Sequence, residues 1–217
     1  ENKDYEVLDE IPFWSNGRGF RNKKRDRLYY YDKLNDKITP ISDEYTNVEL
    51  VNVKDSKVIF AGRTFTDKQG LTSGLYVYDV KSQNLEVIVD KDLYDISYAN
   101  FIEDKIICAL SDMKAYGVNE NHKLYLIDSN KNISLLNDND TWLSCTVGSD
   151  CRLGGGKSFK VIGNKLYFLA TIAERVYLES IDTDGKVEIL SDKDGTIDFF
   201  DISNGEVYYV GMRDYTL

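Results

Sequence analysis

The chain has 217 residues, a length that suits one large domain or two small ones with a real hydrophobic core. Hydrophobic residues make up 42% and charged residues 29%, which excludes a disordered or collagen-like chain. The balance of 27 basic against 37 acidic residues gives a net charge of −10. Such a charge repels both a phosphate backbone and an anionic membrane, so we expect neither nucleic acid nor a membrane as a partner. The 16 Tyr and only 2 Pro favour β-strands.

The first 27 residues are predicted to be an irregular segment rich in aromatic residues and glycine. Residues 10–20 fit no regular strand pattern and indicate a packed loop or an irregular strand. Six basic residues then crowd together: Arg18, Arg21, Lys23, Lys24, Arg25 and Arg27. Such a run sometimes marks a nucleic-acid patch. On an acidic chain, a solvated turn or a segment that faces acidic neighbours is the favoured interpretation.

From residue 28 onward one pattern recurs, an apolar strand that contains tyrosine and ends in aspartate. The four copies end at Asp32, Asp79, Asp128 and Asp182, with spacings of 47, 49 and 54 residues (79 − 32, 128 − 79 and 182 − 128). A polar turn and a second short apolar run follow each copy, over residues 37–41, 85–89, 133–136 and 187–190. Each copy therefore predicts a β-hairpin with the aspartate at its bend.

A second pair of apolar runs lies between successive hairpins, and each pair is split by residues that tolerate a tight bend. The pairs are 48–53 with 58–61, 96–102 with 106–110, 159–162 with 166–170, and 197–202 with 207–210. Four short antiparallel strands repeated at this spacing are typical of a β-propeller blade. The lack of 3.6-residue periodicity excludes a helical solenoid, and a β-sandwich is the alternative.

We therefore predict an all-β fold, with the irregular segment over residues 1–27 and β-propeller blades over residues 28–217. The first hairpin supplies an outer half-blade and the last pair an inner half-blade, which makes three whole blades and two halves. The two halves either pair with each other in a closed four-bladed ring or belong to a larger propeller. We favour a segment of a larger propeller.

Four segments resemble parts of the propellers of bacterial acylaminoacyl-peptidase-like members of the prolyl oligopeptidase family. They are residues 10–20, 27–32, 116–128 and 208–214. The resemblance implies a non-catalytic propeller that gates, by size, the access of short peptides to an α/β-hydrolase domain. That catalytic domain would belong to the same polypeptide but is absent from this chain. The parent protein would then be a serine peptidase.

The chain itself offers no set of catalytic residues. Gly70–Gly74 carries its serine at the wrong position for a Gly-x-Ser-x-Gly elbow, and the only histidine, His122, has no implicated serine. We expect His122 to be a surface or half-buried loop residue. We name no catalytic, cofactor-binding or metal-binding residue, and we expect no cofactor.

Three further short motifs resemble ligand sites but fail on spacing. Gly154–Ser158 lacks the earlier glycine of a phosphate-binding loop and is predicted to be a flexible loop. Asp182–Gly185 and Asp192–Gly195 lack the glutamate at the twelfth position of an EF-hand calcium loop. Since Asp-Gly is a common hairpin turn, we expect turns there.

The cysteines and the absence of a signal-like apolar run indicate a cytoplasmic protein. Cys108 is expected in the core, whereas Cys145 and Cys151 flank a loop and lie close enough in sequence to meet. Because the sequence begins at Glu1, a removed export signal remains the alternative. The alternative function is a self-contained sensor or binding module, with Trp14, Tyr94 and Trp142 on its binding face or in the core.

Overall fold

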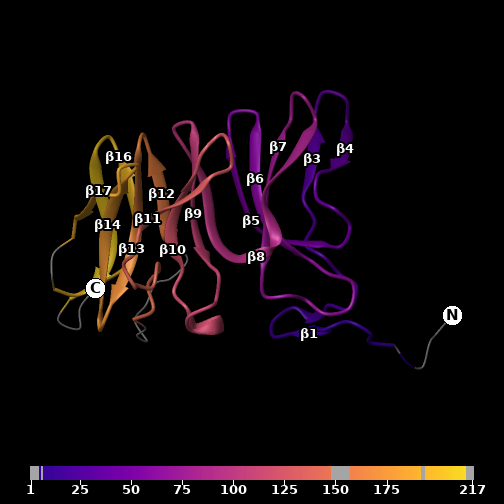
Figure 1. Cartoon of the computed structure of the whole chain (residues 1–217), viewed down its shortest axis with the longest axis horizontal. Coiled ribbons are helices and arrows are strands. Elements are labelled where there is room, and N and C mark those ends of the chain that lie inside the picture. Colours follow the sequence, from indigo (N-terminus) through magenta and orange to yellow (C-terminus); the bar gives the residue numbers. More distant parts are fainter. Residues whose placement is uncertain (1–4, 6, 148–156, 192–193, 214–217) are drawn as a thin grey trace. The chain divides into compact units, whose positions relative to one another are not determined.

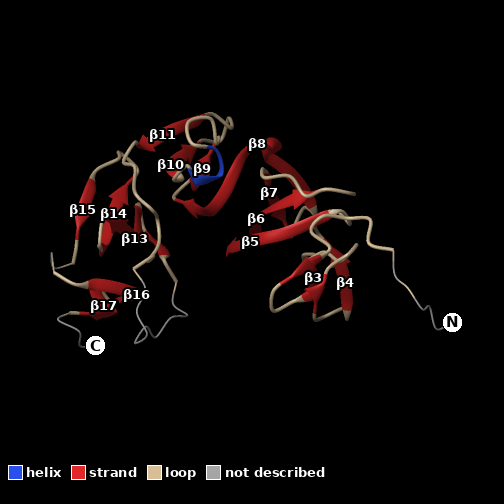
Figure 2. Cartoon of the chain, turned by 90° about the horizontal axis from the view of Figure 1, so that it is seen from below, coloured by secondary structure: helices blue, strands red, loops and turns tan. Residues whose placement is uncertain are grey.

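The computed structural model describes residues 5, 7–147, 157–191 and 194–213, and within them the chain is almost entirely β-structure (Figure 1). The one helical element among the described residues is a short 3-10 turn, η1 (Gly117–Asn119), drawn in blue in Figure 2. The chain divides into two compact units, Glu1–Ala99 and Asn100–Leu217. The prediction of an all-β chain is confirmed.

The first unit contains two hairpins followed by a larger antiparallel sheet. Its strands are β1 (Trp14–Ser15), β2 (Gly19–Phe20), β3 (Tyr29–Asp32), β4 (Lys37–Pro40), β5 (Thr46–Lys54), β6 (Lys57–Thr64) and β7 (Ser73–Asp79). β1 pairs with β2, and β3 pairs with β4. In the larger sheet β5 pairs with β6, β6 with β7, and β7 with β8 (Asn84–Ile102). Residues 28–32 and 37–41 thus form the expected hairpin.

β8 differs from the sequence prediction. Residues 85–89 and 96–102 were expected as two strands, but the structure shows one continuous strand of 19 residues. The intervening residues, 90–95, contain three aspartates but no glycine or proline, and the backbone stays extended through them. The pairing of β8 with β7 shifts register near Ser73 and Leu75, so the ladder of hydrogen bonds is irregular there while the backbone of β8 stays extended.

The strands of the second unit are also antiparallel. They are β9 (Lys105–Ser111), β10 (Lys123–Ile127), β11 (Ile133–Asn137), β12 (Phe159–Ile162), β13 (Lys165–Ile172), β14 (Arg175–Asp182), β15 (Val187–Ile189), β16 (Thr196–Ser203) and β17 (Glu206–Met212). β9, β10 and β11 are successive neighbours, β12 to β15 form a four-stranded sheet, and β16 and β17 form a two-stranded one. The four-stranded sheet has the strand order expected of one blade.

The four repeat aspartates close the hairpins, as predicted. In each hairpin the Oδ1 atom accepts a hydrogen bond from the backbone N–H two residues further on: Leu34 to Asp32 at 2.9 Å, Lys81 to Asp79 at 2.8 Å, Asn130 to Asp128 at 2.9 Å and Asp184 to Asp182 at 3.0 Å. An aspartate mimics one limb of a turn in this way, which explains why the repeat keeps it. Hydrogen bonds from the turn, first from Ser82 N–H, lower the pKa of Asp79.

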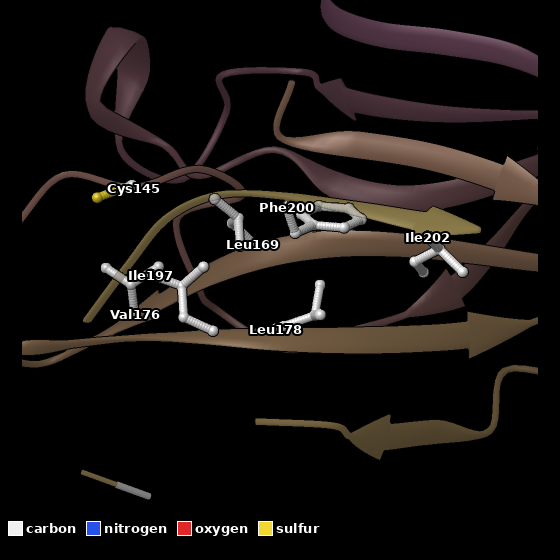
Figure 3. Close-up of a cluster of buried hydrophobic side chains, with 7 residues drawn as sticks. All are labelled: Cys145, Leu169, Val176, Leu178, Ile197, Phe200 and Ile202. Carbon is white, nitrogen blue, oxygen red and sulfur yellow. The ribbon is translucent and has the colours of Figure 1, made fainter. Parts of the chain in front are cut away.

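Apolar clusters join neighbouring sheets within each unit. In the first unit, Ile41 packs with Val58, Phe60 and Tyr78 and so attaches the β3–β4 hairpin to β6 and β7. In the second unit, seven buried residues connect β13 and β14 with β16: Cys145, Leu169, Val176, Leu178, Ile197, Phe200 and Ile202 (Figure 3). Sheets that bury their faces against the next sheet are the packing expected of propeller blades.

Candidate functional site

A basic pocket of about 170 Å³ lies in the first unit, between the irregular N-terminal segment and β5. Four of its lining residues, Arg18, Arg21, Lys24 and Arg25, come from the basic run. A concave site that gathers cations on a chain with a net charge of −10 is the strongest candidate for a functional site among the described residues.

Backbone hydrogen bonds hold the N-terminal segment against the loop that follows β6. Ile11 donates its N–H to Asp67 O at 2.7 Å and accepts from Gln69 N–H at 2.8 Å. Gly17 in the β1–β2 turn and Gly19 at the start of β2 have φ angles of 75° and 69°, in the region that favours glycine. Residues 11–21 therefore form an anchored hairpin.

Arg25 has a structural role in the pocket wall. Its guanidinium forms two hydrogen bonds with Glu10, Nη2 to Oε1 at 2.7 Å and Nη1 to Oε2 at 2.9 Å. The two side chains are only 5% and 4% exposed. Arg25 also lies 3.8 Å above the Phe65 ring and donates to Phe65 O. The hydrogen bonds from Arg25 lower the pKa of Glu10 against the opposing effect of burial.

Arg18 and Arg21 share one carboxylate. Arg18 Nη1 lies 2.8 Å and Arg21 Nη2 3.1 Å from the same atom, Asp26 Oδ2. Arg21 Nη2 also donates to Asn47 Oδ1 at 3.2 Å. Hydrogen bonding to Arg21, followed by the charges of both arginines, lowers the pKa of Asp26. Two cations against one anion leave one positive charge uncompensated within this group.

Lys24 adds a second uncompensated charge. Its ammonium group makes no hydrogen bond or ion pair with any residue that the structure describes, although its neighbour Lys23 pairs with Asp9 at 2.6 Å. On the β5 side, Glu49 is held by Arg63 at 2.7 Å and by Gln69 at 3.2 Å. The pocket therefore has a basic wall and one carboxylate that is already engaged.

These contacts confirm one of the two predictions for the basic run, a segment that faces acidic neighbours. The acidic partners are Asp9, Glu10 and Asp26. Sequence reasoning did not identify the pocket, because its other wall comes from Asn47, Glu49 and Phe65, which follow the basic run by 20 or more positions. The high density of arginine was the only local signal.

The serine and histidine considered above have structural positions. Ser73 is buried at the start of β7, and its hydroxyl has no hydrogen-bond partner among the described residues. His122 is half-buried in the loop immediately before β10, as predicted. Ser73 belongs to the first unit and His122 to the second.

The Asp192–Gly195 motif and the glycine-rich motif are only partly described, whereas Asp182–Gly185 is described throughout. Asp182 Oδ1 accepts hydrogen bonds from the backbone of Asp184 and Lys186, so the predicted turn is confirmed. Residues 154–156 and 192–193 lie outside the described residues. The described part of the chain brings no three His, Cys, Asp or Glu side chains together as a metal site.

Two cysteines of the described residues are buried, and two tryptophans are exposed. Cys108 is buried in β9, and burial raises the pKa of its thiol, whereas Cys145 is buried in the cluster of Figure 3. Cys151 lies outside the described residues, so its pairing with Cys145 stays a prediction. Trp14 and Trp142 are 53% and 47% exposed, which leaves their rings open to a ligand.

Solved structures show which fold the chain has. It matches Pyrococcus horikoshii acylaminoacyl peptidase with a TM-score of 0.70 and 17% identity, over 97% of this chain and 31% of that protein. It matches the β-propeller domain of the Trilobed protease from Pyrococcus furiosus with a TM-score of 0.63 and 17% identity, over 92% of this chain and 59% of that domain. The fold is that of a β-propeller domain.

A third match is Porphyromonas gingivalis dipeptidyl peptidase 4, with a TM-score of 0.54 and 16% identity, over 85% of this chain and 26% of that protein. The propeller chain thus spans about a third or less of the two peptidases. No protein-family model and no curated protein matches the sequence. No helix among the described residues has the length and hydropathy needed to cross a membrane.

Proposed function

We propose that this chain is the non-catalytic propeller portion of a serine peptidase of the prolyl oligopeptidase or acylaminoacyl-peptidase type. The observation that carries the proposal is the propeller fold shared with three such proteases over 85–97% of the chain. The sequence has one histidine and no Gly-x-Ser-x-Gly, so the hydrolytic groups would belong to an α/β-hydrolase domain of the same polypeptide. The parent would act on short peptides in the cytoplasm.

The propeller would act as a gate. A ring of blades over an active site limits entry by size, so folded proteins and long peptides are excluded while short peptides reach the catalytic serine. In this proposal residues 28–217 contribute three whole blades and two half-blades, β3–β4 and β16–β17, to a larger propeller. The two-stranded sheets favour it, because each presents an edge at which two further strands would complete a four-stranded blade.

An activity-based probe on the parent polypeptide tests the catalytic part of this proposal. A fluorophosphonate should label one serine outside residues 1–217, and the isolated chain should remain unlabelled and hydrolyse no acyl-peptide anilide. Labelling of a serine within the chain would overturn the assignment.

To test the gate, cleavage of a series of peptides of increasing length should stop at a sharp limit. Loss of that limit when the blade contacts are loosened, as in Leu178→Ala, would support gating.

The alternative is a self-contained module that binds a ligand or a protein. The exposure of Trp14 and Trp142 favours it, because rings on a rigid sheet scaffold are good binding groups. Sedimentation separates the two functions. A closed four-bladed ring should be a cooperative monomer, whereas an incomplete propeller should self-associate through its two-stranded edges.

A further inference from the structure

We propose that the basic pocket of the first unit is a binding site for a small organic molecule that carries one carboxylate group. This inference does not rest on the proposed peptidase function, because it needs only the residues that line the pocket. The site consists of Arg18, Arg21 and Lys24 as cations, with the buried Arg25–Glu10 pair as a rigid wall.

The three cationic side chains keep hydrogen-bond donors that no described residue uses. Within the described residues Arg18 uses one guanidinium nitrogen, Nη1, and Arg21 uses only Nη2. A guanidinium has five N–H donors, so both side chains keep donors for a further acceptor. Lys24 keeps its whole ammonium group. A planar carboxylate matches the fork of an arginine and would compensate the charge that Asp26 leaves over.

The site is also held in place before any ligand arrives. Arg21 is only 18% exposed in its side chain and is fixed by both Asp26 and Asn47. A pre-positioned donor loses little conformational entropy on binding, which is the main cost for long basic side chains. Arg18, with its side chain 62% exposed, is a more adaptable second donor at the rim.

The acidic group on the β5 side favours a monoanion over a divalent anion, because Arg63 is shared between Glu49 and Asp95 and this group offsets one of the two uncompensated positive charges. Glu49 lines the pocket and is held by Arg63 and Gln69. Its charge opposes a phosphate dianion more strongly than a carboxylate. Pro12 and Phe65 supply apolar surface, and a volume of about 170 Å³ suits a ligand the size of an acylated amino acid.

The test is a titration of the full 217-residue chain at low ionic strength, followed by arginine and lysine side-chain NMR signals. The probes are N-acetyl-leucine, its neutral amide, and inorganic phosphate. The acid should saturate the signals of Arg18, Arg21 and Lys24 with an affinity about tenfold above that of the amide. Phosphate should bind more weakly than the acid. Equal binding of acid and amide, no saturable binding, or tighter binding of phosphate would overturn the proposal.

Matched variants locate the site. Lys24→Gln and Arg18→Gln should each weaken binding by about threefold, since these exposed side chains act through partly screened charge. Both side chains are exposed, so each substitution should leave the fold intact. Glu49→Gln should strengthen binding. Lys33→Gln removes the same charge from the β3–β4 turn, outside the pocket, and should leave the affinity unchanged. An equal loss of affinity in Lys33→Gln and Lys24→Gln would mean that binding depends only on the net charge of the protein, and it would refute a specific site at the pocket.

Discussion

The N-terminal segment of the first unit and the β13–β14–β16 cluster of the second are stabilised by different forces. Residues 10–27 are held by ion pairs within the segment, such as that of Arg18 with Asp26, and by hydrogen bonds to Asn47 and Phe65. The cluster around Leu169 and Leu178 is apolar and excludes water. Apolar packing accepts many partners of similar size, whereas each ion pair needs one particular partner at one particular distance.

Two buried carboxylates show the same difference between ionic and apolar surroundings. Glu10 and Glu179 are 4% and 5% exposed, yet their pKa values shift in opposite directions. Arg25 lowers the pKa of Glu10, whereas Glu179 in β14 has no ion pair among the described residues and burial raises its pKa. Burial alone thus penalises a charge, and a fixed partner reverses the sign.

The largest effect should follow from breaking the apolar cluster. Leu178 is 0% exposed, so Leu178→Ala removes buried methyl groups and leaves a cavity. We expect a loss of about 3 kcal/mol in the free energy of unfolding, measured by urea denaturation. Leu34→Ala makes the same change at a residue that is 96% exposed and should lie within about 0.5 kcal/mol of the unsubstituted chain. Similar values for both variants would mean that the cluster is not a packed core.

A slightly smaller effect should follow from breaking the buried ion pair. Glu10→Ala leaves the Arg25 guanidinium buried without its carboxylate, which should cost about 2 to 3 kcal/mol because Phe65 O still accepts one of its hydrogen bonds. Trypsin should then cut the basic run faster, because the segment detaches more often. The double variant Glu10→Leu/Arg25→Leu should recover part of the loss, since no charge remains buried. Asp9→Ala breaks the exposed pair with Lys23 and should change nothing measurable. If it matched Glu10→Ala, burial would not matter there.

The sequence predicted the apolar region far better than the ionic one. The aspartate-terminated hairpins and their strands follow from local periodicity and turn chemistry, so residues 28–41 or 176–190 could be assigned from neighbours in the chain. The continuous β8 was missed because a register shift carries no residue signature. The pocket was missed because Arg21 meets Asn47, and Arg25 meets Phe65, only after folding.

The pH dependence of stability should distinguish the two carboxylates. Because its folded-state pKa is raised above 4.5, Glu179 favours the folded state below pH 4.5, and this contribution is lost as the pH rises through the folded-state value. Glu10 has a lowered pKa, so its contribution is present above pH 4.5 and is lost as the pH falls. Glu179→Gln should therefore raise the Tm at pH 7.5, and the gain should shrink at pH 4.

Ser180→Ala is the matched control for this measurement, because Ser180 is the next residue of β14 and its buried hydroxyl has no partner among the described residues. Its effect on the Tm should be the same at both pH values, since a serine does not titrate. A pH-independent gain in Glu179→Gln would contradict a raised pKa of Glu179.

The smallest effect should come from the hairpin turns, where neither deep burial nor a full ion pair operates. Asp79 Oδ1 accepts hydrogen bonds from the backbone of Lys81 and Ser82 in the β7–β8 turn. Asp79→Ala removes both acceptors and should lower the Tm by a few degrees, whereas Asp79→Asn keeps an acceptor oxygen and should stay near the unsubstituted value. An asparagine variant as unstable as the alanine one would mean that charge, and not turn geometry, keeps aspartate in the repeat, which would make the hairpins resemble the N-terminal segment.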